Sequence, residues 1–292
     1  MTAQTTFTLV NPQNGNLAFK LFSFGDNSFF DHLQRNNYYS LIWITGGSGK
    51  VKADFFEYSF EEGAMFAFSP YQPFVFLTGN IQGMAIHFHP DFFCIHKHQE
   101  EVACNGVLFN NIYQPPFISI DDMSVATMSM LIDQMRTEMQ NPALAQFELL
   151  ISYLKIFLIT LSRLKTEQQP QAMRSVVGVK EPFILQDLKT SIEKNFKTKH
   201  SAGEYAKELN ISPKALVKIT RTHFNKTLTE LISERIIIEA KRELYLTNKT
   251  VKEIAWELGY EDEYYFSRFF KTHAAISPQM YRDTVGFERG MV

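Results

Sequence analysis

Short apolar runs separated by turn residues fill the first 120 residues of the chain. They recur at 17–24, 38–45, 55–60, 64–68, 73–78 and 82–89. Turn clusters such as "GGSG" at 46–49 and "EEG" at 61–63 separate them. Short runs with regular turn signals are typical of β-strands in a sandwich or barrel. Eighteen of the 27 Phe residues lie in this region, enough to fill a barrel interior or to line an apolar pocket.

The spacing of the apolar positions changes to a helical period at Asp121. This period predicts one helix up to Met139, a break at Asn141 with Pro142 at the first helical position, and a second helix over 143–164. The second helix carries a wide apolar stripe of Phe147, Leu150, Ile151, Leu154, Phe157, Leu158 and Leu161. Such a stripe fits either the core of a domain or a dimer interface, and the sequence leaves both open.

A polar segment with Pro170 and Gly178 follows and is the best candidate for a linker. The chain after it is helical in pattern, starting at Pro182. The pattern therefore predicts an α+β chain. It comprises an N-terminal domain at 1–165 (a barrel at about 1–120 and two helices at 121–165), a linker at 166–180, and an all-α domain at 181–292.

The all-α domain contains a repeat, because residues 201–224 and 251–273 each predict a helix, a short turn and a second helix. Equivalent positions of the two second helices are 50 residues apart. The caps are Ser212 and Asp262, and the buried anchors are Leu216 and Phe266. The matching cations are Lys218 with Arg268, Arg221 with Lys271, and His223 with His273. A small Ala on each first helix lets the second cross it closely, as in helix-turn-helix units that bind the major groove of DNA. One copy would also fit a core hairpin with solvated charges, whereas two matched copies favour DNA binding.

Residues 183–285 closely resemble the DNA-binding domain of the AraC/XylS family of transcriptional regulators, most specifically in "IAWELGYEDEYYFSRFFK" and in "SPQMYR" at 277–282. In that family a long helix bridges two helix-turn-helix units, and residues 229–246 would form it here. The resemblance implies a sequence-specific regulator whose two recognition helices enter successive major grooves of double-stranded DNA. It places the base-reading positions at Lys214, Val217, Lys218, Glu263, Tyr264, Ser267 and Arg268, and the phosphate-binding positions at Arg221 and Lys271.

Three positions depart from the family pattern. A Gly normally ends each recognition helix, but Asn225 and Ala275 stand there in this chain. Asn tolerates the left-handed conformation better than Ala, so the second turn is the less comfortable of the two. Thr220 occupies a position where Phe is usual, which predicts looser packing in the first unit.

The N-terminal half resembles the cupin-like sensor domain of many regulators of this family, through "SLIWITGGSGKV" and "FEEGAMFAFSPYQPFVF". This resemblance implies a small-molecule effector bound in the barrel and a homodimer formed through the helices. RNA polymerase is a further candidate partner. The expected polar contacts of the effector are Tyr39, Trp43, His87 and His89.

Cupins also include metal enzymes, and a strand would point His87 and His89 to one face, a spacing that can start a metal site. A third ligand at strand spacing is missing, and Phe74 stands where metal cupins carry a later His. The sequence also lacks a nucleophile arrangement and a Gly-rich phosphate loop. It therefore predicts no metal, no cofactor and no enzyme. Two alternatives remain: a cupin-type metal enzyme with a DNA-binding appendage, and a regulator whose barrel binds no ligand and serves dimerisation.

Charge and cysteine content change this picture little. Residues 1–180 carry 11 basic and 15 acidic side chains (net −4) and residues 181–292 carry 18 and 16 (net +2). DNA binding must therefore rest on where the cations lie. Cys94 and Cys104 are too few for a disulfide framework, which fits the reducing cytoplasm. The first residues have no signal-peptide pattern, and Glu148 and Lys155 argue against a membrane span in the most apolar segment.

Overall fold

The computed structural model describes residues 6–11, 15–54, 56–78, 80–98, 102, 106–174 and 183–285. The chain forms two compact units. The N-terminal unit comprises Met1–Asn111 and Pro115–Gln168, and the C-terminal unit comprises Ile112–Gln114 and Gln169–Val292. None of the described helices has both the length and the apolar character needed to cross a membrane.

The strands of the N-terminal unit form two antiparallel sheets. They are β1 (Thr6–Val10), β2 (Leu17–Phe24), β3 (Tyr39–Gly46), β4 (Gly49–Ala53), β5 (Phe56–Phe60), β6 (Ala64–Phe68), β7 (Phe74–Thr78), β8 (Gln82–Phe88) and β9 (Phe117–Ser119). The larger sheet has the order β1-β2-β8-β3-β6-β9 and the smaller has the order β5-β4-β7. β2 and β6 have the bounds that the sequence predicts, whereas the apolar pattern predicts neither β1, β4 nor β9.

Aromatic side chains from both sheets pack together between them. Phe22, Ile42 and Phe66 of the larger sheet share one buried cluster with Phe60 and Phe76 of the smaller. The ring of Phe66 meets those of Phe60 and Phe76 edge to face, with centroids 5.2 Å apart in each pair. Burial of each such side chain contributes about 1.5–3 kcal/mol. This cluster therefore holds the two sheets together.

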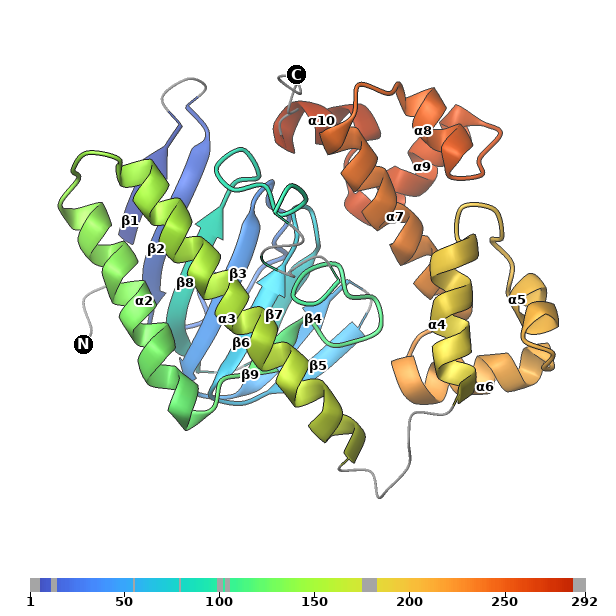
Figure 1. Cartoon of the computed structure of the whole chain (residues 1–292), viewed down its shortest axis with the longest axis horizontal. Helices are drawn as coiled ribbons and strands as arrows, with labels where there is room; N and C mark the ends of the chain where they lie inside the picture. Colours follow the sequence, from blue (N-terminus) through green and yellow to red (C-terminus); the bar gives the residue numbers. More distant parts are fainter. Residues whose placement is uncertain are drawn as a thin grey trace. The chain divides into compact units, whose positions relative to one another are not determined.

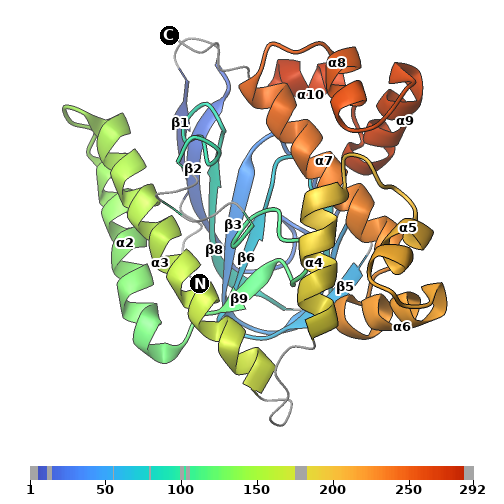
Figure 2. The ribbon, with the colours of Figure 1, turned by 45° about the vertical axis from the view of Figure 1, so that its right-hand side comes forward.

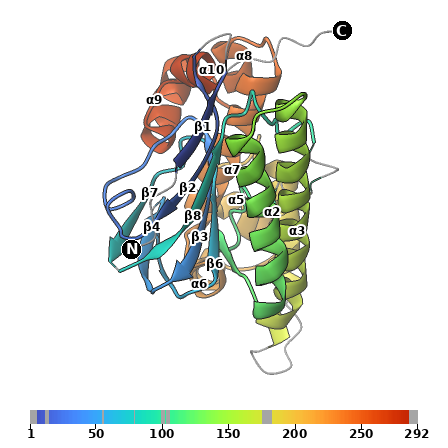
Figure 3. The same ribbon diagram turned by 90° about the vertical axis from the view of Figure 1, so that its left-hand side faces the viewer.

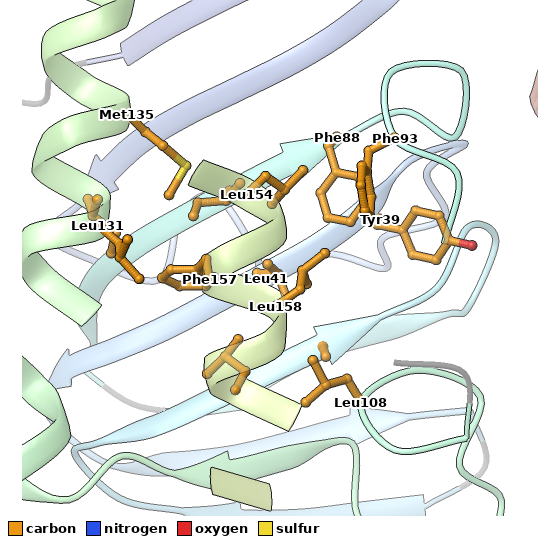
Figure 4. Packing of buried hydrophobic residues seen from close by; sticks show 14 of the residues in the cluster. Tyr39, Leu41, Phe88, Phe93, Leu108, Leu131, Met135, Leu154, Phe157 and Leu158 are labelled. Carbon is orange, nitrogen blue, oxygen red and sulfur yellow. The ribbon is translucent and has the colours of Figure 1, made fainter. Parts of the chain in front are cut away.

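Two long helices, α2 (Asp122–Gln140) and α3 (Gln146–Arg174), cover the other face of the larger sheet (Figures 1 and 3). Their apolar side chains form a second buried cluster with that face. Figure 4 shows Leu154, Phe157 and Leu158 of α3 directed toward Leu41 and Phe88 of the sheet.

The apolar stripe of α3 belongs to this cluster. Leu150, Leu154, Phe157, Leu158 and Leu161 are all fully buried, and Phe147 and Ile151 are partly buried against the same side chains. A single chain therefore already buries the centre of the stripe, while Phe147 and Ile151 keep part of their surface exposed. The sequence leaves open whether the stripe belongs to the core of the domain or forms a dimer interface. The structure shows that it belongs to the core, and the interpretation of this stripe as a dimer interface is wrong.

The ends of α3 also differ from the prediction. Asn141 is the C-cap of α2, and Ala145 has a left-handed φ of 61°, so the helix begins at Gln146 and Pro142 precedes it. The helix then continues to Arg174, which makes residues 166–174 of the expected linker helical. Residues 175–180 of that linker lie outside the described residues.

The C-terminal unit is helical (Figure 2). Its helices are α4 (Phe183–Asn195), α5 (Ala202–Glu208), α6 (Pro213–Phe224), α7 (Leu228–Leu246), α8 (Val251–Glu257), α9 (Glu263–Ala274) and α10 (Pro278–Val285). The long helix α7 contacts α6, α8, α9 and α10. The pairs α5–α6 and α8–α9 are the two predicted helix-turn-helix units, and α7 is the predicted bridge between them.

Candidate nucleic-acid interface

A side-chain cap fixes the start of the first helix in each unit. Ser201 and Glu204 form a capping box at α5, and Thr250 and Glu253 form one at α8. The backbone N–H of Thr250 donates to the Glu253 carboxylate at 2.7 Å, which holds the pKa of Glu253 below its usual range. Each box satisfies helix donors that would otherwise lack partners. The spacing of Ser201 and Glu204 in the sequence predicts the first of these boxes, and the structure confirms it.

The turn of each unit requires a residue in the left-handed conformation. Asn210 has φ 52° in the first unit and Gly259 has φ 82° in the second. In both turns the next backbone N–H bonds back to the buried Ala of the first helix, from Ile211 to Ala206 and from Tyr260 to Ala255. These pairs lie 49 residues apart, whereas the second helices lie 50 apart. Glu261 is therefore one extra residue in the second turn.

The second helix of each unit is also capped as predicted. The Ser212 hydroxyl accepts a hydrogen bond from the backbone N–H of Ala215 at 3.1 Å, and Pro213 opens α6. The Asp262 carboxylate accepts from the backbone N–H groups of Tyr264 and Tyr265 at 2.6 and 3.0 Å. Asp262 therefore serves α9 as its N-cap, and this role accounts for one of the acidic side chains near that end of the helix.

The buried faces of the two second helices are not equally filled. α9 buries Phe266, Phe270 and Ala274, whereas α6 buries Leu216 and Thr220. The position of Phe269, three residues after Phe266, predicts a second buried anchor of α9. In the structure Phe269 is only partly buried, and Phe270 takes that role. Thr220 donates its hydroxyl to the carbonyl of Val217 at 3.2 Å, so this buried hydroxyl has a partner within its own helix.

The opposite faces of α6 and α9 carry the predicted DNA-binding residues. Lys214, Val217, Lys218 and Arg221 are all exposed on α6, and Tyr264, Arg268 and Lys271 are exposed on α9. Glu263 and Ser267 are partly exposed. The spacing of i, i+3, i+4 and i+7 places each set on one helix face, away from the buried anchors. The structure thus brings the residues of each helix together on one surface.

The five cationic side chains in these two sets form no ion pair within the described part of the chain. No described acid lies within ion-pair distance of Lys214, Lys218, Arg221, Arg268 or Lys271. Other cations of the same unit are paired with carboxylates, namely Lys197, Lys199, Lys226, Arg235, Arg242 and Lys249. Unpaired cations on a convex helix face can take up phosphate or base contacts without first breaking an ion pair.

The recognition helices end as the sequence predicts, with a left-handed residue in each case. Asn225 has φ 53° and Ala275 has φ 65°. The backbone N–H of each cap bonds to the carbonyl four residues earlier, that of Arg221 or Lys271. Ala275 holds this conformation without the help that an Asn side chain gives, so its backbone is strained.

A buried ionic cluster fixes the bridging helix α7. Glu239 is 5% exposed, and its carboxylate lies 3.1 Å from Arg235 and 3.2 Å from Lys197. Burial by itself would raise the pKa of Glu239, but these two cations outweigh it and hold the pKa below its usual range. The guanidinium of Arg235 also lies 4.1 Å from the ring centroid of Phe196. The cluster ties α7 to the segment after α4.

The structure separates the four residues expected to contact an effector. In the pairing of β3 with β8, Tyr39 is opposite Phe88 and Ser40 is opposite His87. Tyr39 and Trp43 consequently face the helices, in the cluster with α2 and α3. His87 lies on the opposite face, toward the smaller sheet, and His89 follows the end of β8. Tyr39 and Trp43 therefore do not line the space between the sheets with His87.

His87 is an unusual buried side chain. Its exposed fraction is 5%, and neither ring nitrogen has a hydrogen-bond partner among the described residues. Its ring stacks on Tyr38 with centroids 4.6 Å apart and meets Phe22 edge to face at 5.1 Å. Burial, with a smaller contribution from the charge of Lys20, lowers the pKa of His87 to about 3. The imidazole is therefore neutral at pH 7 and retains an unused donor and an unused acceptor.

His87 and His89 do not form a metal site with other described residues. No group of three or more His, Cys, Asp or Glu side chains in the described ranges is placed to hold a metal ion. The backbone N–H of Asp91 donates to Nδ1 of His89 at 3.2 Å, and Asn37 lies 3.4 Å from Nε2.

Two exposed aromatic residues of the second unit were not among the predicted site residues. Trp256 of α8 is 61% exposed, with the ammonium of Lys252 5.2 Å from its ring centroid, and Tyr265 of α9 is 57% exposed. The sequence could have indicated that both are exposed. Trp256 is adjacent to the buried Ala255, and Tyr265 is adjacent to the buried Phe266, so neither belongs to the buried face of its helix.

Comparisons with known proteins agree with this geometry. A family model described as a helix-turn-helix domain matches residues 205–284. The raffinose operon transcriptional regulatory protein RafR of Pediococcus pentosaceus is 30% identical over 95 residues, which are 32% of this chain and 34% of RafR. The regulatory protein SoxS of Escherichia coli (strain K12) is 31% identical over 99 residues, which are 34% of this chain and 92% of SoxS.

These similarities differ in how much of each relative they include. The chain spans about a third of the length of RafR and most of the length of SoxS. A crystal structure of an apo variant of ToxT from Vibrio cholerae aligns over 97% of this chain and 97% of its own, at 14% identity and a TM-score of 0.43.

Proposed function

Because the chain belongs to the AraC/XylS family of transcriptional regulators, we propose that it is a sequence-specific DNA-binding regulator of transcription. The observation that carries this proposal is the pair of matched, exposed helix faces whose cations have no acidic partner in the described chain. Each face lies on the second helix of a helix-turn-helix unit, the element that enters the major groove.

The side chains on α9 suit direct readout of bases. The guanidinium of Arg268 has the planar fork that fits O6 and N7 of guanine. Tyr264, 78% exposed near the start of α9, is assigned to a thymine methyl group. Glu263 can accept from N4 of cytosine, and Ser267 can donate to or accept from any base. Lys271, one turn further along, is assigned to a phosphate.

The face of α6 is more cationic. Lys218 corresponds to Arg268, and Lys214 and Arg221 lie one turn to either side. Val217, 48% exposed between them, is the apolar member of the set and is assigned to a thymine methyl group. We therefore assign a larger share of the phosphate contacts, and of the salt dependence, to the first unit.

We further propose that the N-terminal unit binds a small-molecule effector through His87. The observation that supports this is the buried imidazole with two unpartnered nitrogens beside Tyr38 and Lys20. A polar group of an effector would satisfy His87 and offset the cost of leaving it unpaired. A homodimer and a contact with RNA polymerase remain part of the proposal, with the α3 stripe excluded as the dimer surface.

Binding-site selection from random double-stranded DNA, followed by footprinting on the selected site, tests the proposed function. The expected result is one preferred sequence with two protected segments on one face of the duplex, about 10 base pairs apart. The double variant Lys218→Ala, Arg268→Ala should lose the preference, whereas Lys52→Ala on β4 of the N-terminal unit should retain it. Recovery of no preferred sequence by the folded wild-type protein would overturn the proposal.

A further inference from the structure

A surface pocket of about 650 Å³ lies on the N-terminal unit, outside the space between the two sheets. Three segments form it: the end of β1 with the start of β2, the loop after β8, and the first turns of α3 with the residues just before them. Its residues belong to the side of the larger sheet that α2 and α3 cover, so the pocket does not include His87. A pocket of this volume is large enough for a small organic molecule.

The floor of the pocket is apolar and aromatic. Phe92 and Phe147 contribute rings whose centroids are 5.8 Å apart, and Ile151 extends the floor along α3. Phe92 also packs on Phe19 of β2 at 5.5 Å, so the sheet holds its ring in place. A floor of this kind favours the apolar body of a ligand, and the faces of its rings attract a cation.

The charges at the pocket are negative. Asp91 and Glu148 line it, and the described residues of its lining include neither Lys nor Arg. His89 also lines it, and its Nδ1 accepts a hydrogen bond from the backbone N–H of Asp91. The carboxylate of Glu148 has no described partner, and that of Asp91 lies 3.4 Å from the same His89 nitrogen. The pocket therefore presents two negative charges above an apolar floor.

We propose that this pocket binds a small organic cation, a primary ammonium carried on an aromatic or aliphatic body. The ammonium would lie between the carboxylates of Asp91 and Glu148, and the body would cover Phe92, Phe147 and Ile151. The first turn of α3 would by itself favour an anion, but Glu148 lies in that turn and supplies the negative charge. This site is independent of the proposed DNA-binding function and of the effector contact at His87.

Isothermal titration calorimetry of the full chain tests the proposal with two probes of the same shape and opposite charge, phenethylamine and 3-phenylpropionate. For a ligand of this size we expect the amine to bind with a Kd of about 1 mM, and the acid to bind at least about tenfold more weakly. Asp91→Asn and Glu148→Gln should each weaken the amine about threefold to tenfold. Glu57→Gln, on β5 and outside the pocket lining, should leave it unchanged.

Three results would overturn the proposal: no binding of the amine up to about 10 mM, equal binding of the acid, or amine binding that neither pocket variant changes. Thermal melting of each variant distinguishes a lost site from a lost fold. Since no DNA is present, the outcome does not depend on whether the protein recognises an operator.

Discussion

Replacement of Gly259 by Ala tests whether the turn between α8 and α9 is as constrained as the structure indicates. Gly259 has φ 82°, and a Cβ at this position would lie 2.2 Å from the carbonyl oxygen of Lys197 and 3.1 Å from the His200 ring. The left-handed backbone alone costs a non-glycine residue about 1–2 kcal/mol. The contact with a backbone oxygen forces a further shift of the turn, so we expect a total loss of about 2–4 kcal/mol.

Hydrogen exchange followed by mass spectrometry gives the assay, because it reports on each unit separately. A loss of 2–4 kcal/mol should accelerate exchange in α8 and α9 by about 30- to 1000-fold, with little change in the N-terminal sheets. Gly203→Ala is the matched control, because Gly203 lies within α5 and a Cβ there would meet nothing within 4 Å. It should stabilise the protein by about 0.5–1 kcal/mol. Unchanged exchange in Gly259→Ala would refute the reasoning.

The other structural predictions concern the core, pH and a helix end. Leu154→Glu should abolish folding of the N-terminal unit, at a cost of about 3–5 kcal/mol or more. The control Ile156→Glu, at a position 48% exposed on the same helix, should melt as the wild type does. A Leu154→Glu protein that is folded and monomeric would restore the interpretation of the α3 stripe as a dimer interface. The pKa of His87 is about 3 in the folded protein, compared with an ordinary value of 6.5. As the pH falls, the unfolded chain therefore binds the proton first. The stability of the protein should consequently decrease below pH 6.5, by about 1–2 kcal/mol at pH 5. His87→Phe should flatten that dependence in denaturant titrations, and an equal slope in both proteins would contradict the assignment. Ala275→Gly should stabilise the C-terminal unit by about 1 kcal/mol, which would appear as a higher denaturation midpoint. Asn225→Gly should change the stability by at most a few tenths of a kcal/mol.

The C-terminal unit is predictable from the sequence because its local signals agree with its fold. Caps at Ser212 and Asp262, a glycine in the second turn, and apolar positions at helical spacing all define the same elements. The exposed positions follow from the buried ones, since a helix with Phe266 inside must turn Arg268 outward. The exchange of Phe269 for Phe270 as an anchor shows the limit, because adjacent aromatic residues leave the phase of the helix uncertain by one position.

The N-terminal unit is less predictable because both faces of its central strand are buried. Tyr39–Ile44 of β3 are buried without interruption, so alternation does not show which side chains face the helices and which face the smaller sheet. This is why Tyr39 and Trp43 appear in the sequence as possible partners of His87. The α3 stripe is ambiguous for a similar reason: a wide apolar face has the same pattern whether a sheet or a second subunit covers it.

The pocket beside α3 has no signal in the sequence. Asp91 and Glu148 are 57 residues apart and come together only through the packing of α3 on the larger sheet. The sequence predicts His89 as a contact of an effector inside the barrel. In the structure His89 lines this pocket rather than the space between the sheets.

The central claim is that the exposed faces of α6 and α9 recognise DNA, with bases assigned to Arg268 and phosphate to Lys271. The most direct test is titration of Arg268→Ala and Lys271→Ala on the selected operator and on scrambled DNA at several salt concentrations. Arg268→Ala should weaken operator binding by about 1–3 kcal/mol and leave scrambled DNA nearly unaffected. Lys271→Ala should weaken both and reduce the salt slope by about one. Unchanged operator affinity in a folded Arg268→Ala protein would contradict the account.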